Sequence, residues 1–332
     1  MNVGLLFEEY REDVLECLHF GTACVVDRDG VIAHVGDTDW LCYYRSASKP
    51  IQALPVLLRG LHKKYGLTEE EAAIFSGSHW GDEEHARVCE SIMAKSGLRE
   101  EDMVMLPTYP NRPARREALL RANQPPRKIY HNCAGKHLGL MLLAREVGDD
   151  VRDYWKRDSK AQHLVREMIS YISDTPYDDI GVGVDGCGVP VFAVPFSQIA
   201  RAYLKLSCPE LIGDGEVRQA VADNMARLHA YPNMIAGHDT VDTIITANPD
   251  LVAKSGAMGV YAIGVRSRGL GIVFKTVDGS HDEFADEAIE ALRQLGIAPG
   301  TQAAIRAAYP DCIVNDNKEI VGRRRPVFNL KP

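Results

Sequence analysis

Residues 44–61 read YRSASKPIQALPVLLRGL, a polar segment followed by an apolar one. In the apolar part, Ile51, Leu54 and Leu58 recur at the spacing of one helix face. Pro50 suits the first turn of a helix, where its missing N–H costs little. The sequence therefore predicts a helix that begins beside this proline.

Two serines and a lysine stand where this helix begins. Ser46 or Ser48 could be its N-cap. Ser46 and Lys49 are three positions apart, near enough to touch at a helix start. A serine hydroxyl is a poor nucleophile until a base takes its proton, and a desolvated lysine can do so. Ser46 and Lys49 are therefore either a catalytic pair or part of a capped helix with a solvated lysine. This stretch alone favours the capped helix.

The composition limits the class of protein. The chain has 332 residues, of which 45% are hydrophobic, enough for the core of one large domain or two. Its 38 Lys and Arg against 46 Asp and Glu give a net charge of -8, which argues against a nucleic-acid partner. We see no basic leader and no apolar run of transmembrane length, so we expect a cytoplasmic protein with no membrane partner. Its eight scattered cysteines are expected to be thiols.

The order of expected elements indicates the fold class. Residues 22–26 and 31–35 are β-branched runs around a turn and predict a hairpin. A capping box at Thr68 predicts a helix start. Residues 103–132 are expected to form a long, functional loop, and residues 251–279 three strands joined by tight turns. Helices and mostly antiparallel strands mix without a regular βαβ pattern, so we expect an α+β or mixed α/β fold.

Two further segments carry serine and lysine. Residues 76–79, SGSH, break a helical region, and residues 254–256, KSG, end an apolar segment. With Ser46-x-x-Lys49 they follow the motif order of the penicillin-recognising serine enzymes. Each motif alone is weak, and the first of these segments alone is best interpreted as a plain turn. Together they could supply a second serine and lysine that shuttle a proton or bind a carboxylate.

A fourth group lies in HNCAGKH and VDGCG. Cysteine and histidine suggest zinc, but their spacing matches no zinc finger. Lysine is an unusual ligand because its amine must first lose a proton. The pattern alone therefore favours structural or incidental roles. The reactive residues of the group are His131, Cys133, Lys136, His137, Asp185 and Cys187.

The segments YRSASKPIQALP, HNCAGKH and VDGCGVPVFAVP resemble the rhizobial-type (class 3) L-asparaginases of the asparaginase II family. SGSHWGDEEH and KSGAMGVYAIG continue the resemblance in the same order, over most of the chain. It implies hydrolysis of L-asparagine to L-aspartate and ammonia. It also implies a serine β-lactamase/glutaminase-like fold, with a mostly antiparallel sheet and flanking helices. Residues 1–332 would form one catalytic unit, which could comprise two subdomains with the site between them, and a homodimer is expected.

The resemblance also implies roles for residues. Two Ser-Lys pairs carry over as Ser46 with Lys49 and Ser78 with Lys254. Ser46 would attack the amide carbon after Lys49 takes its proton, and water would release aspartate from the resulting ester. Which serine attacks stays open.

The resemblance also implies a zinc site. Its zinc would tune substrate binding and would not take part in the chemical step. Its ligands would be Cys133, Lys136 and Cys187. We expect the α-amino and α-carboxylate groups of the substrate to be held by Arg45, His137 and Asp185, because a guanidinium suits a carboxylate and an aspartate suits an ammonium.

Some positions depart from the family pattern. The family usually reads G-G-A-E-G after the second lysine, whereas here Met258 replaces the acid, and residues 238–245 match only loosely. One alternative is therefore a related serine amidohydrolase such as glutaminase, whose substrate differs by one methylene. The absent export signal argues against a β-lactamase or D-amino peptidase. Another alternative is a catalytically altered zinc-binding homologue.

Overall fold

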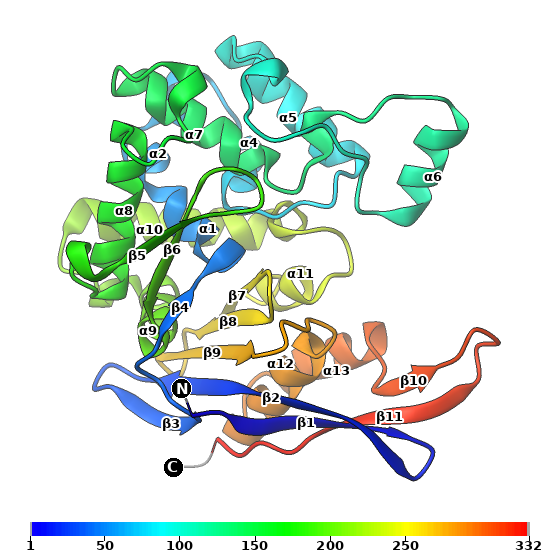
Figure 1. The fold of residues 1–332 in the computed structure, drawn as a ribbon. Coiled ribbons are helices and arrows are strands. Elements are labelled where there is room, and N and C mark those ends of the chain that lie inside the picture. The colour runs from blue at the N-terminus through cyan, green and yellow to red at the C-terminus, as the bar shows by residue number, and fades with distance from the viewer. Residues whose placement is uncertain (1, 331–332) are drawn as a thin grey trace. The chain divides into compact units, whose positions relative to one another are not determined.

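Figure 1 shows the computed structural model of the chain, which describes residues 2–330. The chain divides into two compact units. The first, here the sheet unit, comprises Met1–Ala47, Val194–Cys208 and Asp250–Pro332. The second, here the helical unit, comprises Ser48–Ala193 and Pro209–Pro249. Antiparallel strands and helices make up the structure, which confirms the predicted α+β class.

The sheet unit is built on one large antiparallel sheet. Its strands follow the order β10-β11-β1-β2-β9-β8-β7, and β3 pairs with β2. Their bounds are β1 (Gly4–Arg11), β2 (Val14–Val26), β3 (Val31–Val35), β7 (Leu251–Gly256), β8 (Val260–Val265), β9 (Leu270–Thr276), β10 (Cys312–Val314) and β11 (Ile320–Pro326). The predicted hairpin (β2 with β3) and the predicted three strands (β7 to β9) are confirmed.

Helices cover both faces of this sheet. A Cβ at Gly264 or Gly271 would stand 2.4 or 1.9 Å from a backbone oxygen of α9 (Phe196–Ser207), so glycine lets this helix approach closely. On the opposite face of β8, Tyr261 stacks on Phe284 at 4.9 Å between ring centroids. Phe284 begins α12 (Phe284–Leu295), which is followed by α13 (Pro299–Ala308).

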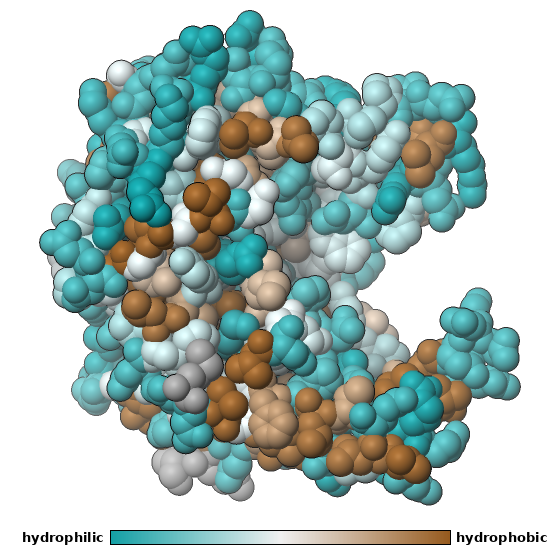
Figure 2. Space-filling model, in the orientation of Figure 1, coloured by the Kyte–Doolittle hydropathy of each residue, from teal (hydrophilic) through white to brown (hydrophobic). Residues whose placement is uncertain are grey.

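The first half of β2 is exposed on both faces from Val14 to Leu18. Val14, Leu18 and Phe20 point to one face and are exposed, as is Leu15 on the other. Hydrophobic side chains are visible along the strands of the sheet unit in Figure 2. His19, between them in sequence, points to the opposite face and is only 13% exposed.

The helical unit has a buried central helix, α7 (Ala134–Glu146). Every side chain from Ala134 to Ala144 is buried, as expected for a helix that is packed on all sides. The other helices of this unit are α1 (Lys49–Gln52), α2 (Leu54–Leu58), α3 (Leu61–Lys64), α4 (Glu69–Ala73), α5 (Glu83–Ser96), α6 (Pro113–Arg121), α8 (Lys160–Ser173), α10 (Gly215–Ala230) and α11 (Val241–Thr246). Strand β5 (Gly181–Val184) pairs with β6 (Pro190–Pro195), whose last two residues belong to the sheet unit, as does β4 (Leu41–Tyr43).

Two expectations for this unit meet different outcomes. The capping box is confirmed, with Thr68 accepting from the Glu71 N–H and the Glu71 side chain accepting in return. The long loop predicted over residues 103–132 is wrong in its middle, where Pro113–Arg121 forms α6. No residue of α6 is buried, so it has no apolar periodicity to detect. Its alanine, leucine, arginine and glutamate are nevertheless good helix formers.

Within residues 2–330, no helix is both long and apolar enough to cross a membrane.

A buried carboxyl group in α12 gives a first testable prediction. Glu287 is fully buried, and neither carboxylate oxygen has a hydrogen-bond partner. Burial and the nearby carboxylates of Glu283 and Asp286 raise its pKa well above the usual range. When the pKa of an acid is higher in the folded protein than in the unfolded chain, the protein becomes less stable as pH rises from the unfolded-state pKa to the folded-state pKa. Glu287→Gln is therefore expected to stabilise the protein at pH 8 by about 1–3 kcal/mol.

Urea unfolding in metal-free buffer measures this effect. The gain should be smaller at pH 5 than at pH 8, because glutamine does not titrate and the wild-type carboxyl does. Glu290→Gln, on the same helix, is the control, because Glu290 pairs with Arg293 and should show no gain. An equal gain for Glu287→Gln at both pH values would contradict the assigned cause.

Candidate active site

A lysine–serine pair lies inside the helical unit. Lys49, the first residue of α1, is fully buried. Its Nζ donates to Ser78 Oγ at 2.8 Å and to the carbonyl of Asn132 at 3.2 Å. This contact joins Lys49 to Ser78, and the pairing of Lys49 with Ser46 stays a prediction. A buried amine bonded to a half-buried hydroxyl is the arrangement of a base beside the group that it deprotonates.

The loop before α5 holds Ser78 in place. Its backbone N–H donates to the carbonyl of Ile235 at 2.8 Å, and Trp80 N donates to Ala236 O at 3.0 Å. A Cβ at Gly77 would stand 2.0 Å from Met234 O, so only glycine allows this approach. The serine hydroxyl is thus fixed by a backbone segment distant in sequence.

His79, directly after Ser78, is an uncharged neighbour. It is fully buried, and its Nδ1 accepts from Gly81 N at 3.2 Å. Burial, then the nearby His85 and Lys49, hold its pKa well below the usual range. The imidazole therefore adds no positive charge beside Lys49.

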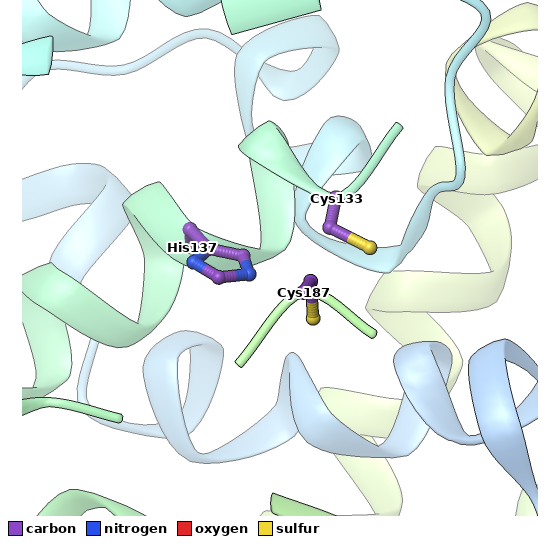
Figure 3. Close-up of side chains that lie close together, drawn as sticks. All are labelled: Cys133, His137 and Cys187. Carbon is purple, nitrogen blue, oxygen red and sulfur yellow. The ribbon is translucent and has the colours of Figure 1, made fainter. Parts of the chain in front are cut away.

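Two cysteines and a histidine converge at the start of α7 (Figure 3). Cys133 precedes the helix, His137 lies one turn along it, and Cys187 comes from the turn between β5 and β6. One ligand atom from each lies within 4.8 Å of the others. Lys136 Nζ donates to the Cys187 sulfur at 3.1 Å, and Asp185 Oδ2 is 4.0 Å from that sulfur.

The two thiols have opposite pKa shifts. The hydrogen bond between them and the nearby Lys49 hold the pKa of Cys133 well below its usual range, although burial opposes this. The same hydrogen bond, together with burial, raises the pKa of Cys187. Burial alone lowers the pKa of Lys136, but the sulfurs of Cys187 and Cys133 outweigh burial and raise it. The cluster thus combines a cysteine whose pKa is lowered with a lysine whose pKa is raised.

The same residues connect the cysteines to the lysine–serine pair. Asn132, whose carbonyl accepts from Lys49, also places its Oδ1 3.3 Å from the Cys133 sulfur. Lys49 is among the groups that lower the Cys133 pKa. Charge at one cluster therefore acts on the other.

His137 is fully buried beside the cysteines. Its Nδ1 lies 2.5 Å from the Tyr154 hydroxyl, which also accepts from Val104 N at 2.9 Å. Its Nε2 is buried and has no hydrogen-bond partner. Burial and the nearby Lys136 hold its pKa well below the usual range, so the ring is neutral. His137 therefore lies with the two cysteines, and its expected contact with the substrate stays a prediction.

The donor atoms of this cluster fit zinc. Cysteine sulfur and imidazole nitrogen are the ligands that zinc prefers. A buried imidazole nitrogen without a partner is costly unless it binds something. Its second nitrogen is oriented by Tyr154, as is common for metal-binding histidines.

The remaining predicted residues lie in the sheet unit. Arg45 has a left-handed backbone, with φ of 49°, directly before Ser46. Such a conformation is costly for a residue with a side chain and often marks a functional position. A Cβ at Gly256 would stand 2.6 Å from Tyr44 O, so the end of β7 lies against this segment. Lys254 on β7 is fully buried and donates to Ser255 O at 2.9 Å.

The structure thus groups the predicted residues by unit. Ser46, Arg45 and Lys254 belong to the sheet unit, and the Ser78–Lys254 pairing stays a prediction. Lys49 and Ser78 share the helical unit with Cys133, Lys136, His137, Asp185 and Cys187.

Two contributors were not predicted. Asn132 lies within the HNCAGKH segment, so its position between His131 and Cys133 was an available signal. Tyr154 stands in no motif, and only the fold shows its contact with His137.

Three comparisons relate the chain to known proteins. The family model described as L-asparaginase II matches residues 7–326. Comparison with the curated proteins found no match.

Several solved structures are similar. A β-lactamase from Mycobacterium bovis is 16% identical, covering 87% of this chain and 94% of its own, with a TM-score of 0.43. A class C β-lactamase from Rhodobacter sphaeroides is 17% identical, covering 84% and 95%, with a TM-score of 0.43. A probable glutaminase from Bacillus subtilis, complexed with 6-diazo-5-oxo-L-norleucine, is 13% identical, covering 86% and 82%, with a TM-score of 0.31. At these values no residue role is transferred from them.

The family match is of a different kind, because it spans nearly the whole chain and includes every segment that carries the serine, lysine and cysteine clusters. On that ground the chain is a hydrolase and belongs to the L-asparaginase II family.

Proposed function

We propose that this protein hydrolyses the side-chain amide of L-asparagine to L-aspartate and ammonia. The observation that carries the proposal is the 2.8 Å contact between the buried Lys49 Nζ and Ser78 Oγ. Amide hydrolysis by serine needs a hydroxyl whose proton can be taken and returned, and an amine at this distance can do both. The family match supports a small amide substrate.

The two serines have different roles in this proposal. Lys49 takes the proton of Ser46, whose Oγ attacks the amide carbon. Ser78 passes a proton from Lys49 to the departing nitrogen, so that ammonia leaves and an aspartyl ester remains. Water, losing its proton to Lys49, then attacks the ester, and the proton returns to Ser46 Oγ as aspartate leaves. Lys254 assists this transfer.

A second assignment exchanges the serines. Lys49 Nζ contacts the Ser78 hydroxyl, and in this assignment Ser78 itself is the nucleophile. The substrate and products would be the same. The two assignments differ in which serine carries the ester.

Serine variants distinguish these assignments. We expect Ser46→Ala to abolish ester formation. Ser78→Ala should lower kcat about 10²–10⁴-fold, as for loss of a proton-transfer group, yet still form the ester. Acid quenching with asparagine, followed by peptide mass spectrometry, locates the ester. An ester on Ser78 in the Ser46→Ala protein would exchange the roles.

We also propose that Cys133, Lys136 and Cys187 hold zinc, with His137 as a further candidate ligand. Bound zinc would supply a fixed positive charge that tunes substrate binding. Lys136 must lose its proton to become a ligand, whereas the low pKa of Cys133 already favours its thiolate.

Substrate binding is assigned to two charged residues. Arg45 binds the α-carboxylate through its forked donors, and Asp185 binds the α-ammonium. Met258, where the family has an acid, lies in the turn between β7 and β8, and its carbonyl accepts from Lys275 at 2.6 Å. The homodimer stays a prediction.

Ammonia release from L-asparagine, with L-glutamine in parallel, tests the proposed activity. Release from asparagine alone would support it. Comparable release from glutamine would favour the glutaminase alternative. Folded protein that releases no ammonia from either substrate would be the catalytically altered homologue.

A further inference from the structure

A second cluster of metal-ligand atoms lies in the sheet unit. One atom each of Glu9, His19 and Glu283 lies within 4.8 Å of the others. Glu9 on β1 pairs with Cys17 on β2, and Phe7 pairs with His19, so Glu9 and His19 are diagonal neighbours on one face. Glu283 is the N-cap residue of α12.

His19 has the geometry of a metal-binding imidazole. Its Nδ1 lies 2.7 Å from Asp278 Oδ2, a hydrogen bond that fixes the proton on Nδ1. Its Nε2 is buried without a hydrogen-bond partner, 3.6 Å from Glu283 Oε1 and 3.9 Å from Glu9 Oε2. These two distances are too long for hydrogen bonds. Metal-binding histidines commonly donate their other N–H to a carboxylate in this way.

The two glutamates are also arranged as ligands. Arg324 Nε donates to Glu9 Oε1 at 2.8 Å, which leaves Oε2 directed toward His19. Glu283 is 1% exposed, and its Oε2 has no hydrogen-bond partner. Its nearest guanidinium, that of Arg324, is 3.9 Å from Oε1. A carboxylate this deeply buried is costly without a closer cation.

The charges around the cluster are not balanced. The carboxylates of Glu9, Asp278 and Glu283 lie in this region, and Asp286 adds a fourth. Asp286 pairs with Arg306 at 2.7 Å and with Arg324 at 3.3 Å. Two arginines, with Lys275 near Asp278, thus face four carboxylates. A divalent cation would supply the missing charge.

We propose that Glu9, His19 and Glu283 bind a divalent first-row transition-metal ion. One imidazole nitrogen and two carboxylates suit manganese or zinc, and the absence of sulfur among these three ligands makes the site unlike the cysteine cluster. Asp278 and Arg324 orient the ligands. The ion would link β1 and β2 to the start of α12, a role separate from the proposed hydrolysis.

Manganese binding tests the site in full-length protein. We use a Cys133→Ser/Cys187→Ser background, stripped with chelator, and follow free Mn²⁺ by electron paramagnetic resonance. One equivalent should bind. Adding His19→Ala should remove binding, and Asp278→Asn should weaken it about 10- to 100-fold. His34→Ala, an exposed histidine on β3, is the matched control and should bind normally.

Zinc content gives a second measurement that does not depend on that background. Wild-type protein equilibrated with Zn²⁺ should hold one equivalent more than His19→Ala or Glu283→Gln, by elemental analysis. Circular dichroism of each metal-free variant checks that it is folded. If Mn²⁺ does not bind in the Cys133→Ser/Cys187→Ser background, or if His19→Ala and wild type hold equal amounts of zinc, the proposal is overturned.

Discussion

Lys49→Met is expected to lower kcat/KM for L-asparagine about 10³–10⁴-fold, as for loss of a general base. Methionine keeps the length and apolar stem of the side chain but has no amine. The hydroxyl of Ser78 and the carbonyl of Asn132 lose their shared donor, and no proton can move through position 49. Steady-state ammonia release measures the loss.

The unfolding midpoint separates a chemical effect from a structural one. Replacing the fully buried amine removes its desolvation cost but leaves the Asn132 carbonyl without this donor, so we expect the two effects to offset and the unfolding midpoint to change little. Lys64→Met is the control, because Lys64 is an exposed partner of Glu146 in the same unit, and its activity should stay at the wild-type level. A Lys49→Met protein within tenfold of wild type would show that another group carries the proton.

Elements specified by neighbouring residues could be predicted from the sequence. The hairpin of β2 and β3 has a turn of a few residues, and the capping box joins Thr68 to Glu71 within one helical turn. Both depend on contacts that short spacing reveals. Residues 103–132 were harder, because the exposed helix α6 leaves no apolar pattern.

Contacts between distant residues could not be predicted in this way. Phe7 on β1 pairs with Pro326 on β11, from opposite ends of the chain. Spacing suggested the neighbours Ser46 and Lys49, whereas the contact with Ser78 spans 29 positions and depends on how the loop at Gly77 packs.

The cysteine cluster shows the same limit. No spacing rule joins Cys133 to Cys187. The pattern grouped the two segments that carry them but favoured incidental roles, and only the family resemblance made both cysteines ligands before the fold placed them beside α7. The resemblance did not suggest that His137 would lie there with a buried, unpartnered nitrogen.

Cys133→Ser and Cys187→Ser are each expected to lower zinc content by one equivalent per chain. The two sulfurs lie in one buried cluster, and serine is a far weaker zinc ligand than thiolate. Because a metal bound only to the folded state stabilises it, we also expect both variants to lose the increase in Tm that zinc gives wild type. Elemental analysis of protein purified without chelator, with thermal unfolding with and without Zn²⁺, measures both effects.

Cys24→Ser is the matched control for this loss. Cys24 is also buried, but burial raises its pKa to about 12, so it stays a thiol and should contribute no ligand. The zinc content of each cysteine variant must also be measured with His19→Ala added. Zinc bound by Glu9, His19 and Glu283 then cannot hide the zinc lost from the cysteine cluster. Zinc that persists in both Cys133→Ser and Cys187→Ser on that background would exclude these sulfurs as ligands. His137, whose Nε2 has no other partner, would then have to bind the metal without them.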